Sequence, residues 1–238
     1  MLQISVINEA TTIGDANVQA MIPAFAQQWN GDLEPVWGVG QANFTFVPNG
    51  ATPDAGTWWV VFLDDSDQAD ALAYHDLTDE GLPISKVFVR TILADNSSVS
   101  VGATHEICEM AADPWLNGAY QDPQGTFWAA EICDPVEADQ YGYQIGDILV
   151  TDFVTPNWFA HQHAQGQIDL KNYAQAAFEV LSGGYAQKFD PQKGWQQING
   201  ARAMHSQMVV HPPHGSRRER RARAWRNWRR SERVFRTR

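Results

Sequence analysis

The sequence predicts an α+β fold in which a mixed β-sheet packs against helices. Short segments with the apolar patterns of strands recur through residues 2–93, and an amphipathic segment with helical spacing lies between the first two of them. Beyond Pro114 the chain becomes rich in turn signals such as Asn117-Gly118 and Asp122-Pro123. We therefore expect a sheet-and-helix part followed by a loop-rich C-terminal part.

The first half of the chain supplies most of the predicted regular structure. Residues 2–8 alternate apolar and polar side chains, and residues 15–29 place apolar side chains three and four apart, as a helix ending at Asn30-Gly31 does. The predicted strands that follow are 42–47, 57–63 and 86–93. Residues 58–63 are apolar throughout, which is typical of a central strand.

A second helix follows Asn96-Ser97-Ser98 and contains the His105 motif described below. After it, we expect a short apolar run at 127–133 and a strand at 147–154. Residues 169–181 have the pattern of a third helix that stops at Ser182-Gly183-Gly184. Two short strands around Tyr185 and Trp195 are expected to form a hairpin.

Length and composition are those of one folded domain with an appendage. The chain has 238 residues, of which 44% are hydrophobic, enough to bury a sizeable core. We expect a single domain over 1–203, a linker at 204–215 and an Arg-rich tail at 216–238. No run of about 18 apolar residues and no signal-peptide pattern is present, so we expect no membrane partner and a cytoplasmic or virion-associated protein.

Charge is divided unevenly between the body and the tail. Residues 217–238 contain 11 Arg and 2 Glu, a charge of +9, while the rest of the chain carries −20 within the total of −11. An acidic body suits cation binding, whereas a basic tail with interleaved Trp225 and Trp228 suits phosphates, bases or an acidic protein surface. Nucleic acid and an acidic protein surface are therefore the two predicted partners of the tail, which is either disordered or folded on a partner.

The two cysteines, Cys108 and Cys133, each lie in an Ile-Cys dipeptide beside an acidic residue. Two buried reduced thiols are the simpler interpretation, because free Cys is among the most buried residue types. A disulfide joining the two acidic segments is the alternative.

The motif His105-Glu106-x-x-Glu109 places three ligand-capable side chains on one helical turn. Residues four apart lie about 40° apart around a helix, so His105 and Glu109 can meet one cation. Glu106 points to the side, where a carboxylate can take a proton from a water that the cation activates. We therefore predict His105 and Glu109 as metal ligands and Glu106 as the catalytic base.

A second acidic cluster, Glu131-Ile132-Cys133-Asp134-Pro135-Val136-Glu137, is the predicted source of the remaining ligands. We predict Glu131 as a ligand and Asp134 as either a ligand or the group that orients His105. Asp113 is expected at the helix end. The His161-Gln162-His163 segment is a weaker alternative source of ligands.

These features resemble the zincin metallopeptidase superfamily over residues 2–135. That family carries His-Glu-x-x-His on a helix preceded by a mixed sheet whose edge strand aligns the substrate. Its gluzincin branch adds a Glu-x-x-x-Asp segment, to which Glu131-x-x-Asp134 is similar but one residue shorter. The resemblance implies a zincin-like α+β domain that hydrolyses a peptide or protein with Zn²⁺.

Wider motifs are also similar to those of uncharacterised proteins from bacteria and tailed phages. The segments concerned are 105–114, 131–137 and 153–159. This resemblance implies no established activity. The alternative to a hydrolase is a structural or assembly protein, associated with a phage virion, whose metal joins two segments and whose tail binds a partner, and the arginine tail favours it.

Glu in place of the second motif His changes the metals that the site suits. One imidazole with two carboxylates accepts Mn²⁺ or Fe²⁺ as well as Zn²⁺. With Asp113, Asp134 and Glu137 nearby in sequence, an oxygen-rich Ca²⁺ site is a further alternative.

Overall fold

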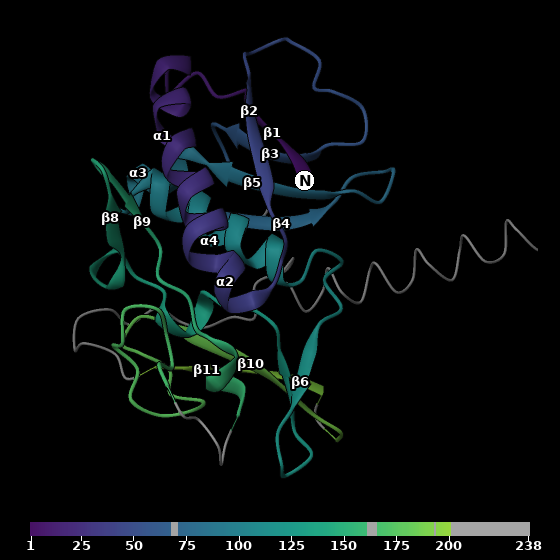
Figure 1. Ribbon diagram of the computed structural model, residues 1–238, viewed down its shortest axis with the longest axis vertical. Helices are drawn as coiled ribbons and strands as arrows, with labels where there is room; N and C mark the ends of the chain where they lie inside the picture. The colour runs from purple at the N-terminus through teal and green to yellow at the C-terminus, as the bar shows by residue number, and fades with distance from the viewer. Residues whose placement is uncertain (68–70, 161–165, 193, 201–238) are drawn as a thin grey trace, which may run out of the picture.

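The computed structural model describes residues 1–67, 71–160, 166–192 and 194–200 (Figure 1). The strands, labelled as in Figure 1, are β1 (Leu2–Asn8), β2 (Ala42–Val47), β3 (Trp58–Leu63), β4 (Ala73–Leu77), β5 (Pro83–Phe88), β6 (Ala119–Gln121), β7 (Phe127–Ala129), β8 (Tyr143–Ile145), β9 (Ile148–Val150), β10 (Tyr185–Asp190) and β11 (Gly194–Asn199). The helices are α1 (Asp15–Gln27), α2 (Glu34–Trp37), α3 (Val89–Ala94) and α4 (Val99–Ala112). A π-helix, η1 (Gln28–Leu33), joins α1 to α2, and short 3-10 helices are η2 (Asp134–Val136), η3 (Asp139–Tyr141) and η4 (Pro156–Phe159).

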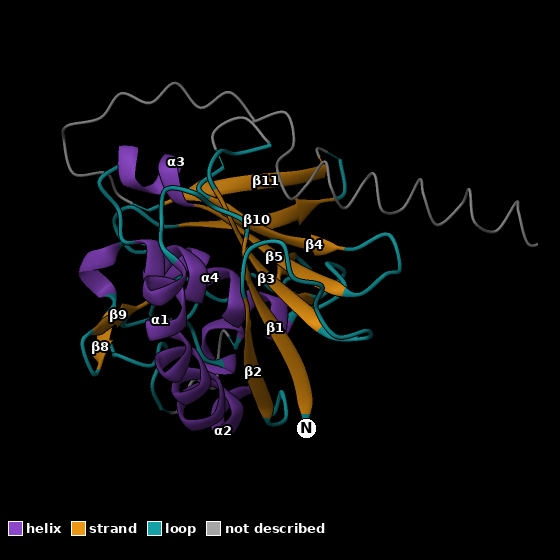
Figure 2. Ribbon diagram, turned by 90° about the horizontal axis from the view of Figure 1, so that it is seen from above, coloured by secondary structure: helices purple, strands orange, loops and turns teal. Residues whose placement is uncertain are grey.

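The largest sheet has five strands in the order β2-β1-β3-β5-β4. Its strands pair in parallel except for the edge strand β4, which runs antiparallel to β5 and places His75 opposite Ser85. Helices α1, α2 and α4 gather on one face of this sheet (Figure 2), and α4 packs against β4 and β5. The motif-bearing helix therefore lies directly beside the edge strand.

The second half of the described chain contains two smaller sheets. One has four strands in the order β11-β10-β7-β6, and the other is the β8-β9 hairpin. A single cluster of buried side chains extends from Ile4 in β1 to Ala186 in β10 and includes Trp29, Ile107 and Trp158. The predicted α+β class is confirmed, as are the first three predicted strands to within a residue and the hairpin around Tyr185 and Trp195.

The first helical segment continues past Asn30-Gly31, contrary to the prediction. The Asn30 side chain donates to the carbonyl of Ala42 and accepts from its N–H, at 2.9 Å each, so it fastens the helix to β2 instead of ending it. The chain leaves α2 at Gly38, whose φ of 66° is the left-handed conformation that glycine adopts without strain.

The prediction of a strand at 86–93 is also wrong for residues 89–93, which belong to a helix. Strand β5 ends at Phe88, and α3 follows because Val89 and Ile92, three residues apart, are both buried on one helical face. Strand β4 was not predicted at all.

The helix predicted at 169–181 is absent. The carboxylate of Asp169 accepts the backbone N–H groups of Tyr173 and Ala174, and Asn172 and Phe178 have positive φ angles of 63° and 61°, which a right-handed helix excludes. The strand predicted at 147–154 shortens to β9.

The predicted linker and tail, and the domain end at residue 203, lie outside the described residues. None of the helices in the described ranges combines the length and the apolar character that crossing a bilayer requires.

Candidate metal centre

Helix α4 holds the predicted motif in the interior of the molecule. From Ala103 to Ala111 every residue of the helix is buried, so the helix has no solvated face along this stretch. Two side-chain contacts hold α4 between its neighbours. Ser85 Oγ on β5 donates to the carbonyl of Glu106 at 3.2 Å, and Thr104 Oγ1 accepts the N–H of Thr151 at 2.9 Å.

A histidine that the sequence did not single out enters the site from the edge strand. His75 lies in the middle of β4 and is fully buried. Its Nδ1 is 3.1 Å from Glu106 Oε2 and 3.8 Å from Glu109 Oε2. Its Nε2 is buried and has no hydrogen-bond partner among the described residues. A buried imidazole nitrogen without a partner is costly unless a ligand binds it.

The acidic segment after β7 approaches the other side of α4. Its backbone is held by hydrogen bonds from Val154 N–H to the Ile132 carbonyl and from Leu181 N–H to the Pro135 carbonyl. The N–H of Cys133 donates to Glu109 Oε1 at 3.2 Å, which joins this segment to the motif helix. Asp134 Oδ1 lies 3.1 Å from His105 Nε2.

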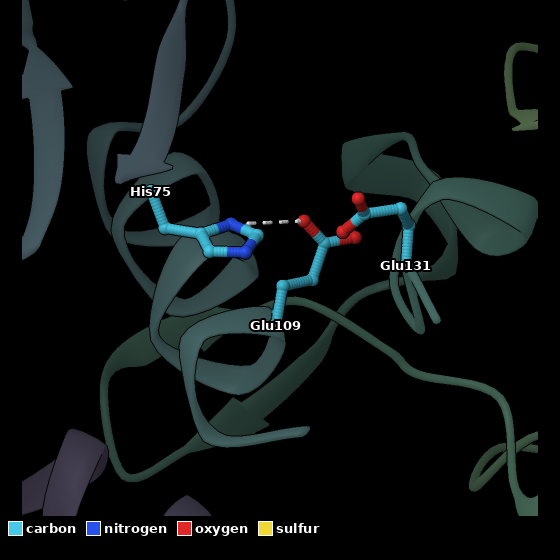
Figure 3. A group of neighbouring side chains, drawn as sticks. All are labelled: His75, Glu109 and Glu131. Atoms are coloured by element: carbon cyan, nitrogen blue, oxygen red, sulfur yellow. Dashed lines mark ion pairs between the residues drawn. The ribbon is translucent and has the colours of Figure 1, made fainter. Parts of the chain in front are cut away.

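Two groups of three buried side chains could each hold a metal ion. The His75 group consists of His75, Glu109 and Glu131, and the His105 group consists of His105, Glu109 and Asp134. Within each group, one ligand atom per residue lies within 4.8 Å of the others. Figure 3 shows His75, Glu109 and Glu131 pointing toward one another from β4, α4 and the segment after β7.

The structure thus brings together all five predicted site residues but divides them differently. Glu131 is grouped with Glu109 and His75 instead of with His105. The third member of the group that contains His105 and Glu109 is Asp134. Glu106 faces His75. The expected helix-end role of Asp113 is confirmed, since its Oδ1 accepts the N–H groups of Asn117 and Gly118. His161 and His163 lie outside the described residues.

The site stabilises positive charge at His105. Burial by itself lowers the pKa of this imidazole, but the negative charge of Glu109 and the hydrogen bond with Asp134 raise it well above its ordinary value. Glu109 lies 3.3 Å from the same nitrogen.

The cysteines lie beside these ligands as buried, unbridged thiols, as the simpler interpretation predicts. Burial, together with the hydrogen bond to Cys108, raises the pKa of the Cys133 thiol well above its ordinary value. The thiol of Cys133 therefore stays protonated and acts as an apolar neighbour of the site.

Comparisons with models of protein families, with curated proteins and with solved structures find no match for this chain.

Proposed function

We propose that this protein is a metal-dependent hydrolase, most simply a zincin-like peptidase. The observation that carries the proposal is the convergence of two imidazoles and the carboxylate of Glu109 from α4 and the edge strand β4 in a buried site. The side chains of Glu131 and Asp134 complete the donor set.

The donors fit a transition metal better than Ca²⁺. Each group contains one imidazole and two carboxylates, which suit Zn²⁺, Mn²⁺ and Fe²⁺, whereas Ca²⁺ takes oxygen ligands alone. We propose Zn²⁺ first. A divalent cation held here would polarise a substrate carbonyl and lower the pKa of a coordinated water to about 7.

We propose Glu106 as the base. Its carboxylate is adjacent to the ligands and oriented by His75 Nδ1. The side chains of Glu106 and His105 are 4% and 8% exposed, while those of His75, Glu109 and Asp134 are fully covered. Glu106 and His105 are therefore the least covered of these residues, and in the proposed mechanism Glu106 accepts a proton from water and later donates it to the leaving amine.

The edge strand supports a peptide as the substrate. β4 is the last strand of its sheet, so its outer backbone groups can pair with an extended chain as an added strand. A peptide bound in this way would run alongside α4, because α4 packs against β4.

A peptide-library cleavage assay on the full chain tests this function. We expect metal-dependent cleavage by the wild type and by Glu80→Gln, an exposed control carboxylate. Glu106→Gln should keep its metal but lose turnover, and Glu109→Ala should lose both. Equal turnover by the wild type and by Glu106→Gln would refute the role of Glu106, and an inactive wild type with bound metal would refute the hydrolase.

A structural metal is the second candidate, and the burial of the ligands favours it. Glu109 and Asp134 are fully covered and belong to separate segments, so an ion between them would fasten α4 to the chain after β7. Under this alternative, chelation lowers the melting temperature of a protein that cleaves nothing. The virion association and the partners of the basic tail remain predictions, since the tail lies outside the described residues.

A further inference from the structure

The two carboxylate oxygens of Glu109 face two different histidines. Oε2 lies 3.8 Å from His75 Nδ1, and Oε1 lies 3.3 Å from His105 Nε2. Glu109 is also the one residue common to the His75 group and the His105 group. A carboxylate placed between two sets of ligands can give one oxygen to each of two ions.

We propose that the centre holds two divalent cations bridged by Glu109. One lies among His75, Glu109 and Glu131, and the other among His105, Glu109 and Asp134. Two-metal sites in hydrolases hold their ions about 3.5–4 Å apart, a separation that a single carboxylate can span. This inference rests on the proposed metal-dependent function and specifies its metal content.

The two positions offer similar ligands. Each combines one buried imidazole with a second carboxylate of its own, Glu131 in the first case and Asp134 in the second. Both are therefore suited to the same borderline metals, Zn²⁺, Mn²⁺ or Fe²⁺.

His75 supplies an independent indication that the first position is a site. Histidines that bind metals usually donate through one ring nitrogen to a carboxylate and give the other nitrogen to the ion. His75 Nδ1 contacts Glu106, while the fully buried Nε2 has no hydrogen-bond partner among the described residues. The imidazole is thus oriented on one side and open to a cation on the other.

The formal charges agree with two ions. Around the two imidazoles lie four buried carboxylates, those of Glu106, Glu109, Glu131 and Asp134. With a cation bound at each imidazole in place of a proton, the four ionised carboxylates bring four negative charges, which equals the charge of two divalent cations. A single divalent cation offsets half of it, and buried charge is costly unless it is compensated.

Metal stoichiometry tests the proposal on the full chain. The chain is depleted of metal, dialysed to equilibrium against Zn²⁺, and measured by elemental analysis; Glu109→Ala reports whatever the remainder of the chain binds. We expect the wild type to hold two ions more per chain than Glu109→Ala. The variants His75→Ala and His105→Ala should each hold one ion more than Glu109→Ala. The control variant Asp113→Asn alters a buried carboxylate at the end of the same helix. Because Asp113 belongs to neither ligand group, this variant should hold as many ions as the wild type.

Loading with Mn²⁺ adds a measurement that needs no variant. Two bridged Mn²⁺ ions are magnetically coupled, so the electron paramagnetic resonance spectrum of the fully loaded wild type should differ from that of isolated Mn²⁺. A wild type holding one ion more than Glu109→Ala, with an uncoupled spectrum, would overturn the dinuclear centre and leave the proposed metal-dependent function standing. A wild type holding no more than Glu109→Ala would overturn both.

Discussion

A buried pair of carboxyl groups that belongs to neither ligand group should make the stability of this protein fall as the pH rises. Asp152 and Asp169 are 1% and 0% exposed. Asp169 accepts the backbone N–H groups of Tyr173 and Ala174. Burial, followed by the charge of Asp169 and a hydrogen bond with it, raises the pKa of Asp152 from 3.8 to about 8. Asp152 therefore keeps its proton in the folded protein at neutral pH.

The sign and size of the effect follow from this pKa. Between pH 4 and pH 8 the unfolded chain has lost the proton of Asp152 while the folded chain keeps it, so the free energy of unfolding falls with rising pH. The slope is about 1.4 kcal/mol per pH unit, which makes a total on the order of 5 kcal/mol. Above the folded pKa both states are ionised, and the slope vanishes.

Urea denaturation measures the free energy of unfolding of the wild type and of Asp152→Asn from pH 4 to pH 9. The amide has the shape of the protonated acid and does not ionise, so the variant should lose this slope and be the more stable protein at pH 8. Asp147→Asn, which alters an exposed carboxyl on the β8-β9 turn, should follow the wild type. A curve for Asp152→Asn that runs parallel to that of the wild type across this range would refute a raised pKa of Asp152.

Three further predictions concern the site and the tail. Zn²⁺ added to metal-depleted protein should raise the melting temperature in calorimetry, since an ion that binds only the folded state stabilises it by about 2.7 kcal/mol at 100 times its Kd; an unchanged melting temperature would contradict a metal centre. Gly184→Ala should destabilise the fold by about 1–3 kcal/mol in urea denaturation, because a Cβ there would lie 2.6 Å from the Asp134 carbonyl oxygen and force the ligand segment to move. Deleting residues 216–238 should abolish salt-sensitive binding to DNA in a filter-binding assay if the tail contacts phosphates, and binding that survives the deletion would place the contact elsewhere.

The elements that could be predicted from the sequence are those whose patterns are local. Strands β1, β2 and β3 have alternating or continuous apolar residues, and α4 follows a clear loop signal. Strand β4 has the sequence Ala-Tyr-His-Asp-Leu, in which polar residues interrupt the apolar ones. It is a strand because it pairs along its length with β5, a long-range interaction that no window around residue 75 reveals. The lone His75 between two predicted strands was the available signal.

The candidate site was predictable to the same extent. Helical spacing places His105, Glu106 and Glu109 together, and the density of acids at 131–137 indicates the second ligand segment. Which carboxylate faces which histidine depends on how β4 and the segment after β7 pack on opposite sides of α4, and sequence spacing does not contain that information. Of the three predicted ligands, the structure groups Glu131 with Glu109 and His75, while His105 is grouped with Glu109 and Asp134.

The neighbours of Glu109 explain why a glutamate suits this position. Its Oε1 accepts the N–H of Cys133 and lies within ion-pair distance of His105, while its Oε2 faces His75. Each nitrogen of an imidazole has at most one lone pair, so a nitrogen that binds an ion cannot also accept the Cys133 N–H. A histidine would therefore serve one ligand group and leave a buried N–H without its acceptor, which costs about 1–3 kcal/mol. The proposed shared carboxylate would account for a glutamate at this position together with His75 on the neighbouring strand.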